Sequence, residues 1–237
     1  MATQAGSIAA NLERVIERIR RAATRVGRQA DEITIVAVSK TFPAEAIRTA
    51  YDAGLRHFGE NRIQEFEAKH QTLESFADTI WHFIGHLQSN KAHRAVHLFD
   101  RIDSVDSISL AHKLDVATTT QATSLPVLIE VRLSAEETKS GVREDELPQL
   151  AGSIRELPHL KLHGLMTIPP YSIDPQNARP YFRRLRELRD SICRQLGLAL
   201  PVLSMGMSND FEIAIEEGAT EIRMGTALFG ERARAKP

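Results

Sequence analysis

The stretch ITIVAVSKTFPAEAIRTAYDAGLRHFGE, residues 33–60, decides the fold. It opens on a short apolar run rich in β-branched residues, continues through a segment of helical period, and ends on a second short run. Neighbouring parallel strands need such a crossover, because both must start from the same edge of the sheet. We therefore interpret this stretch as a strand, a helix and a second, parallel strand.

The same alternation continues along the rest of the chain. Strands are predicted at residues 33–39, 57–60, 81–85, 101–105, 126–132, 161–168, 201–206 and 221–225. Helices are predicted at residues 43–53, 63–73, 91–99, 107–119, 144–155, 175–196 and 209–217. A doubly wound open sheet would need a Gly-rich dinucleotide turn after the first strand, and SKTFPAE is not one. The predicted fold class is therefore α/β, a single (β/α)8 TIM barrel.

No Gly/Ser linker or change of composition divides the chain, so we expect residues 1–237 to form one domain, with the barrel at about residues 33–231. A surface helix is expected before the barrel, at about residues 7–26, with Ser7 available as its N-cap. One apolar stripe at helical spacing supports it. The stripe consists of Ile8, Leu12, Val15, Ile16, Ile19 and Val26.

Charge and composition favour a small-molecule partner. Thirty basic against thirty-one acidic residues give a formal charge of -1, so no overall field attracts nucleic acid or anionic lipid. The first 23 residues are too regularly charged for a signal peptide or membrane span. The single cysteine, Cys193, excludes an intramolecular disulfide. We therefore expect a cytoplasmic protein that binds neither nucleic acid nor membrane.

Lys40 directly follows the first predicted strand, and the functional groups of this fold lie at the C-terminal ends of the strands. A partly desolvated position lowers the proton affinity of a lysine and leaves its amine nucleophilic near neutral pH. Lys40 therefore suits a Schiff base. The alternative is an ordinary lysine that reaches solvent from the end of a strand, and its position alone leaves both interpretations open.

The loops after the last two strands, residues 205–210 and 224–227, are suited to phosphate, which this fold usually binds there. Their glycines allow a close approach of the backbone, and N–H groups at a helix start attract anions. The hydroxyls of Ser208 and Thr226 can add donors. The alternative is two capped helices, with a capping box that starts at Asn209.

Three further polar residues lie at inner positions of predicted strands or directly after them. Asn61 follows the second strand, but it could instead cap the next helix. His82 lies in the third strand, with a satisfied core histidine as the alternative. Arg223 lies within the eighth strand, where an unpaired guanidinium is costly unless it faces a polar site. A heteroaromatic cofactor nitrogen and the carboxylate of Glu130 are both possible partners for it.

No metal site is predicted. On a strand, His82 and His86 would lie about 13 Å apart, too far for one ion. His93 and His97 could chelate from a helix, but no third ligand is placed beside them. The sequence also contains no G-x-S-x-G elbow, P-loop or Cys/His dyad.

Taken together, five segments at strand ends closely resemble the pyridoxal phosphate homeostasis protein family, also called YggS/PROSC. The resemblance runs from about residue 33 to 231. The segments are AVSKTFPAEAI (37–47), FGENRIQE (58–65), WHFIGHLQSNK (81–91), GLMTIPP (164–170) and LSMGMSNDFEIAIEEGATEIRMGTALFG (203–230).

This resemblance implies a fold-type III barrel like the N-terminal domain of alanine racemase, with pyridoxal 5'-phosphate (PLP) as the cofactor. It implies that Lys40 is the Schiff-base lysine and that Arg223 lies beside the pyridine nitrogen. It also implies phosphate contacts from Ser208, Gly225 and Thr226. The other residues expected in the pocket from these motifs are Asn61, His82, Met166, Ser204 and Met207.

An arginine at the ring nitrogen keeps that nitrogen unprotonated, which weakens the cofactor as an electron sink. Racemases with this ring partner add a tyrosine from a further β domain and a partner subunit, for which this chain has no room. Tyr171 is the one tyrosine near the mouth, and it is better interpreted as a loop residue. We therefore expect a monomeric PLP carrier that supplies apo PLP-dependent enzymes, and we assign no catalytic residue. The alternative is a small fold-type III enzyme, such as an amino acid racemase, in which Lys40 is both anchor and base.

Overall fold

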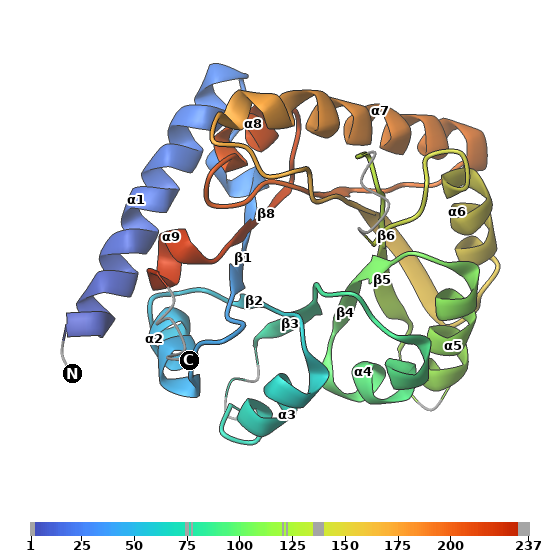
Figure 1. Cartoon of the computed structure of the whole chain (residues 1–237), viewed down its shortest axis with the longest axis horizontal. Helices are drawn as coiled ribbons and strands as arrows, with labels where there is room; N and C mark the ends of the chain where they lie inside the picture. Colours follow the sequence, from blue (N-terminus) through green and yellow to red (C-terminus); the bar gives the residue numbers. More distant parts are fainter. Residues whose placement is uncertain are drawn as a thin grey trace.

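Eight parallel strands close into a barrel in chain order, with β8 next to β1 (Figure 1). The structure, a computed structural model, describes residues 3–73, 76, 78–119, 121, 123–134 and 140–231. The predicted α/β barrel is confirmed. The strands are β1 (Thr34–Val38), β2 (His57–Glu60), β3 (Ile80–Phe83), β4 (Arg101–Val105), β5 (Leu125–Glu130), β6 (Leu160–Met166), β7 (Val202–Ser204) and β8 (Glu221–Met224).

The register of the barrel aligns the ends of neighbouring strands. Val36 of β1 lies opposite His57 of β2 on one side and Arg223 of β8 on the other. Every residue of β4 and β8 is buried, because helices cover the outer face and side chains fill the interior. The C-terminal ends of the strands therefore meet at one mouth.

Each predicted helix is present, with shifted ends. The helices after β1 are α2 (Ala44–Asp52), α3 (Ile63–His70), α4 (Ala92–Leu98), α5 (Ile108–Thr118), α6 (Leu147–Arg155), α7 (Arg179–Leu196), α8 (Phe211–Glu216) and α9 (Thr226–Phe229). The largest shift is at α7, which was predicted from residue 175. A separate 3-10 turn, Pro175–Ala178, comes first, and α7 starts where Pro180 fits into its first turn.

Helix α1 (Thr3–Arg25) runs alongside α8 and α9 (Figure 1). It begins before Ser7, so the position predicted as the N-cap lies inside the helix. The predicted stripe is buried except at two positions: Ile16 is only partly buried, and Val26 lies beyond the helix and is 42% exposed. Val26 was thus wrongly included, because the helix ends at Arg25. Within the described residues, no helix has the length and apolar composition that crossing a bilayer requires.

Candidate functional site

Lys40 follows β1 at the C-terminal end of the barrel, and its side chain is half-buried. Ala37 of β1 pairs with Met224 of β8, so Gly225 follows its strand at the same edge. A Cβ added to Gly225 would lie 3.7 Å from the Cβ of Val38. The structure therefore brings the predicted lysine and the loop after β8 together.

The loops after β7 and β8 also contact each other. The hydroxyl of Ser208 accepts a hydrogen bond of 3.2 Å from the N–H of Ala227. Gly206 turns the chain out of β7 with a φ of 92°, and a Cβ there would lie 2.5 Å from the Cβ of Ala214. Only glycine fits this turn, and with it the two predicted phosphate loops form one surface beside Lys40.

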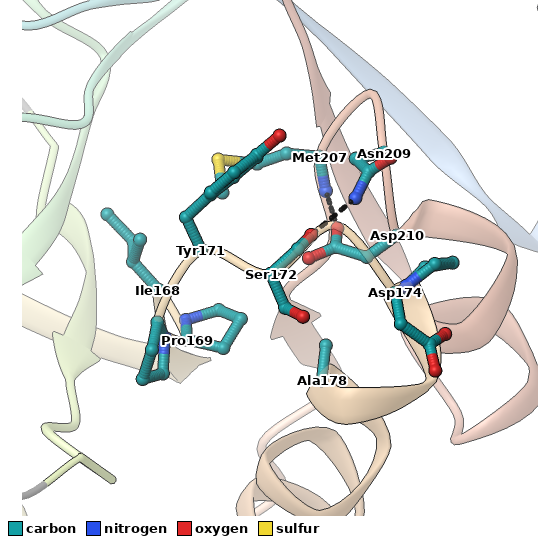
Figure 2. Close-up of a pocket in the computed structure, with 11 residues that line it drawn as sticks. Ile168, Pro169, Tyr171, Ser172, Asp174, Ala178, Met207, Asn209 and Asp210 are labelled. Carbon is teal, nitrogen blue, oxygen red and sulfur yellow. Dashed lines mark hydrogen bonds between the residues drawn. The ribbon is translucent and has the colours of Figure 1, made fainter.

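The capping box predicted as an alternative at Asn209 is not formed. Asp210, and not Asn209, is the N-cap residue of α8. The amide of Asn209 donates to the carbonyl oxygen of Ser172 at 3.0 Å, and Asp210 accepts from the N–H of Met207 at 2.6 Å (Figure 2). The bond from Asn209 to Ser172 fastens the loop after β7 to the loop after β6, and the bond from Met207 to Asp210 closes the loop after β7 on itself.

A cleft of about 210 Å³ lies between these two loops. Figure 2 shows Met207 on one side of the cleft and Tyr171 reaching across toward it. Tyr171 is 85% exposed, which agrees with its interpretation as a loop residue. Two further predicted pocket residues, Met166 and Ser204, are the last residues of β6 and β7, and both are fully buried.

Arg223 of β8 is 3% exposed and is held by oxygen atoms of the barrel wall. One guanidinium nitrogen donates to the carbonyl oxygen and hydroxyl of Ser204 at 2.8 and 2.9 Å. The other donates to the carbonyl oxygen of Thr167 at 2.9 Å. Burial lowers the pKa of Arg223, and nearby carboxylates only partly offset this.

The pairing of Arg223 with Glu130, which the sequence left open, is not found among the described residues. Glu130 instead accepts from the hydroxyl of Ser140 at 3.2 Å, and burial raises the pKa of its carboxyl group. The Nε of Arg223 makes no hydrogen bond to any described residue. It is therefore available to an acceptor atom of a ligand.

Asn61 directly follows β2 and is half-buried. The N-cap residue of α3 is Arg62, so the helix-cap alternative for Asn61 is not adopted. Gly85 packs against it so closely that an added Cβ would lie 2.5 Å from the carbonyl oxygen of Asn61. This contact fixes the backbone of Asn61 at the mouth.

His82 belongs to a different cluster, in the N-terminal half of the barrel. It is fully buried, and it pairs in register with Arg101, the first residue of β4. Its Nδ1 lies 3.1 Å from a carboxylate oxygen of Asp103, and its Nε2 lies 3.0 Å from the Nδ1 of His57. Both ring nitrogens are engaged, which favours the alternative of a satisfied core histidine over a cofactor contact.

The same cluster has the ligand types of a metal site but already holds a cation. His82, Asp103 and Glu221 offer three ligand atoms within 4.8 Å of one another. Arg101 donates to both oxygens of Glu221 at 2.6 Å and to Asp103 at 2.5 and 2.9 Å. Although burial opposes it, these carboxylates raise the pKa of Arg101 above its usual range. The guanidinium thus supplies the charge that a metal ion would bring.

Comparison with known proteins agrees with this geometry. Residues 10–233 match the family model described as alanine racemase, N-terminal domain. The pyridoxal phosphate homeostasis protein of Aquifex aeolicus is 49% identical over 221 residues, which cover 93% of this chain and 96% of the relative. The chain belongs to the pyridoxal phosphate homeostasis protein family. The resemblance seen in the sequence is confirmed.

Two solved structures show how members of this family and their fold relatives are built. PipY of Synechococcus elongatus, solved with PLP bound, is 41% identical and has a TM-score of 0.78, covering 90% of this chain and all of its own (100%). Alanine racemase of Corynebacterium glutamicum has a TM-score of 0.70 at 18% identity, covering 98% of this chain and 64% of its own. The similarity to this alanine racemase shows a common fold and nothing more.

One group of charged residues beside the candidate site was missed in the sequence. This group lies directly behind the turn that contains Lys40. It consists of Glu60 of β2 and of Glu65 and Lys69 of α3. Two signals could have found it: a glutamate at the end of the short predicted strand HFGE, and a Glu–Lys pair four residues apart on the following helix.

Proposed function

We propose that this chain binds PLP at the mouth of its barrel and holds it reversibly as a Schiff base on Lys40, as part of intracellular PLP homeostasis. The convergence of Lys40, the buried Arg223 and the joined loops after β7 and β8 at one barrel end carries this proposal. PipY, a relative of the same family and fold with PLP bound, supports it.

The donors around the mouth fit the polar groups of PLP. Ser208, Gly225 and Thr226 would hold the phosphate, because hydroxyls and backbone N–H groups bind anions. The Nε of Arg223 would donate to the pyridine nitrogen, a neutral acceptor. The remaining residues proposed to line the pocket are Asn61, Met166, Ser204 and Met207. His82 lies in the buried cluster below and is not included.

These residues support a carrier better than a racemase. Bound PLP supplies an aldehyde that amines attack, and its ring acts as an electron sink when the ring nitrogen is protonated. Arg223 cannot pass a proton to that nitrogen, because a guanidinium does not give up its proton in proteins. The remaining candidate for a second acid or base, Tyr171, faces solvent. Lys40 therefore serves as a tether.

The proposal extends to location and partners. The half-buried thiol of Cys193 needs no oxidising compartment, and the formal charge of -1 gives no field for nucleic acid. We propose a cytoplasmic monomer that binds PLP and passes it to apo PLP-dependent enzymes.

Replacement of Lys40 tests the covalent link. Protein loaded with PLP should show a visible absorption band that Lys40→Ala abolishes, because the imine needs the Lys40 amine. Lys113→Ala, at an exposed lysine of α5, should keep the band. An unchanged band in Lys40→Ala would refute the assignment of the lysine.

A turnover assay separates the carrier from the enzyme. The loaded protein should leave a panel of single-enantiomer amino acids unracemised, and it should restore activity to an apo PLP-dependent enzyme. Substantial racemisation that disappears in Lys40→Ala would replace the carrier with a racemase.

A further inference from the structure

Thr41, the residue after Lys40, has a strained backbone. Its φ is 70°, and among the described residues it is the one non-glycine with a positive φ. A β-branched side chain is disfavoured in this region, so the conformation persists only where surrounding contacts impose it. The direction in which the chain leaves Lys40 is therefore set by those contacts.

The contacts come from α3, on the outside of the barrel. Lys69 donates from its Nζ to the carbonyl oxygens of Ser39 and Phe42 at 3.3 and 3.2 Å. The N–H of Thr41 donates to a carboxylate oxygen of Glu65. The N–H of Phe42 donates to the carbonyl oxygen of Ser39 at 3.1 Å and closes the turn. Lys69 thus binds both ends of the strained turn.

A second set of bonds fixes Lys69 itself. Its Nζ lies 2.8 Å from a carboxylate oxygen of Glu60 and 3.1 Å from one of Glu65, and its side chain is only 12% exposed. The same Glu60 oxygen accepts from the hydroxyl of Ser39 at 2.8 Å. The other Glu60 oxygen is buried without a partner among the described residues, so Lys69 is the cation on which this carboxylate depends.

Alternation along the strand places this group behind Lys40. The pairing of β1 with β2 continues through Ser39, whose N–H donates to the carbonyl oxygen of Gly59 at 3.0 Å. The hydroxyl of Ser39 bonds to Glu60 on the α3 side of the wall, and because successive side chains of a strand point to opposite faces, we expect Lys40 to turn toward the barrel mouth. A charge outside the wall can therefore orient an amine inside it.

We propose that Lys69 is a positioning residue for Lys40: it holds the strained turn Ser39–Phe42 and so aims the Lys40 amine into the PLP pocket. This inference rests on the proposed function. A positioning role differs from a purely stabilising one, because Lys69 then affects PLP binding through the backbone conformation of Thr41.

Glycine at position 41 separates the two roles, because glycine adopts a positive φ without strain. Lys69→Met should weaken PLP binding about tenfold in a spectroscopic titration, and Thr41→Gly in the Lys69→Met background should restore it to within about threefold of the wild type. Lys113→Met, on the exposed face of α5, is the matched control and should bind PLP like the wild type. Lys69→Met should also have a lower melting temperature than the wild type. Adding Thr41→Gly should not restore this melting temperature, because Glu60 still lacks its cation.

Two results would overturn the inference: wild-type affinity in Lys69→Met, or a double variant that binds PLP no better than Lys69→Met. If Lys69→Met does not fold, Lys69→Arg replaces it, since a planar guanidinium keeps the charge but cannot reach all four oxygens as the ammonium does. A smaller loss of PLP affinity in Lys69→Arg that Thr41→Gly again restores then supports the inference. A loss of PLP affinity that Thr41→Gly does not restore refutes it.

Amide hydrogen exchange of the protein without PLP gives a readout that does not depend on the proposed function. Lys69→Met should accelerate exchange at residues 39–42 and leave the remaining strands unchanged. Uniform acceleration across the barrel would mean that Lys69 only stabilises the fold. A wild type without a Lys40-dependent absorption band would refute the proposed function, and exchange at residues 39–42 would still decide the role of Lys69.

Discussion

Gly206 is the residue on which the loop after β7 depends, since its φ of 92° and its contact with Ala214 both exclude a side chain. Gly206→Ala should lower the free energy of unfolding by about 2–4 kcal/mol, because strain and overpacking add. PLP binding should weaken as well, because Ser208 moves with the loop. Gly197→Ala is the control: its φ is 64° but no atom lies within 4 Å of an added Cβ. It should cost about 1 kcal/mol in urea unfolding. Equal costs at the two positions would contradict the steric argument.

The location of a single residue could be predicted from the sequence where the residue directly follows a strand of the barrel. Lys40 and Gly225 follow their strands, and a closed barrel must bring strand ends together. His82 was ambiguous, because its partners His57 and Asp103 lie on other strands and only the register between strands brings them to it. Hydrogen-bond partners of this kind are set by tertiary packing, which no local pattern records.

Helix α1 supports the two helices that start at the proposed phosphate loops. Asn11 donates to the carbonyl oxygen of Leu228 in α9 at 2.8 Å, and Arg18 forms an ion pair with Glu212 of α8 at 3.1 Å. Ile19, 2% exposed, lies in the apolar contact between α1 and the rest of the protein. The elements around the proposed PLP site therefore depend on packing along α1.

Truncation within α1 tests this dependence. Ile19→Ala should lower the free energy of unfolding by about 2–4 kcal/mol, because it leaves a cavity under the helix. Ile16→Ala removes the same atoms from a partly buried position of the same helix and should cost about half as much. Urea unfolding of both variants measures the difference. A larger loss for Ile16→Ala would show that the buried stripe was misassigned.

Elements were predicted well where hydrophobic period and turn residues agree. The strands at residues 57–60 and 101–105 have the predicted ends, and each is a short run of mixed polar and apolar residues bounded by loops. Helix starts were predicted less well: α6 was expected from residue 144 but begins at Leu147, next to Pro148. Helical period continues through a preceding turn, so it cannot mark where the first helical hydrogen bond forms.

Across the whole molecule, a buried ionic cluster ties opposite walls of the barrel together. Arg101 of β4 binds Glu221 of β8 at 2.6 Å, and these strands lie four places apart in the ring of eight. Both residues are the first of their strands, as is His57 of β2. The bonds therefore cross the interior near the N-terminal end and leave the opposite mouth to the proposed PLP site. Removing Arg101 would leave two buried carboxylates without their cation, so this end of the barrel is specialised for stability.

His57 makes the stability of this barrel depend on pH. Burial, and then the neighbouring His82, lower the pKa of His57 from 6.5 to about 4. Between these values the unfolded chain binds a proton that the folded protein does not. Stability therefore falls as the pH drops from 6.5 toward 4, and this group causes no further loss below that. The full shift in the pKa of His57 corresponds to about 3 kcal/mol in the free energy of unfolding. Because His57 is partly exposed, we expect a smaller effect of about 1–2 kcal/mol.

Other groups oppose this trend, so the effect of His57 must be measured as a difference. Burial raises the pKa of Glu60 and Glu130, and their protonation favours the folded state as the pH falls. Between pH 7 and pH 4.5, wild-type protein should lose about 1–2 kcal/mol more stability in urea unfolding than His57→Gln, which does not titrate. His112→Gln, at an exposed histidine of α5, should follow the wild type. Parallel pH profiles for wild type and His57→Gln would show that His57 has the same pKa in the folded and the unfolded protein. The buried cluster would then tolerate a proton on the imidazole of His57.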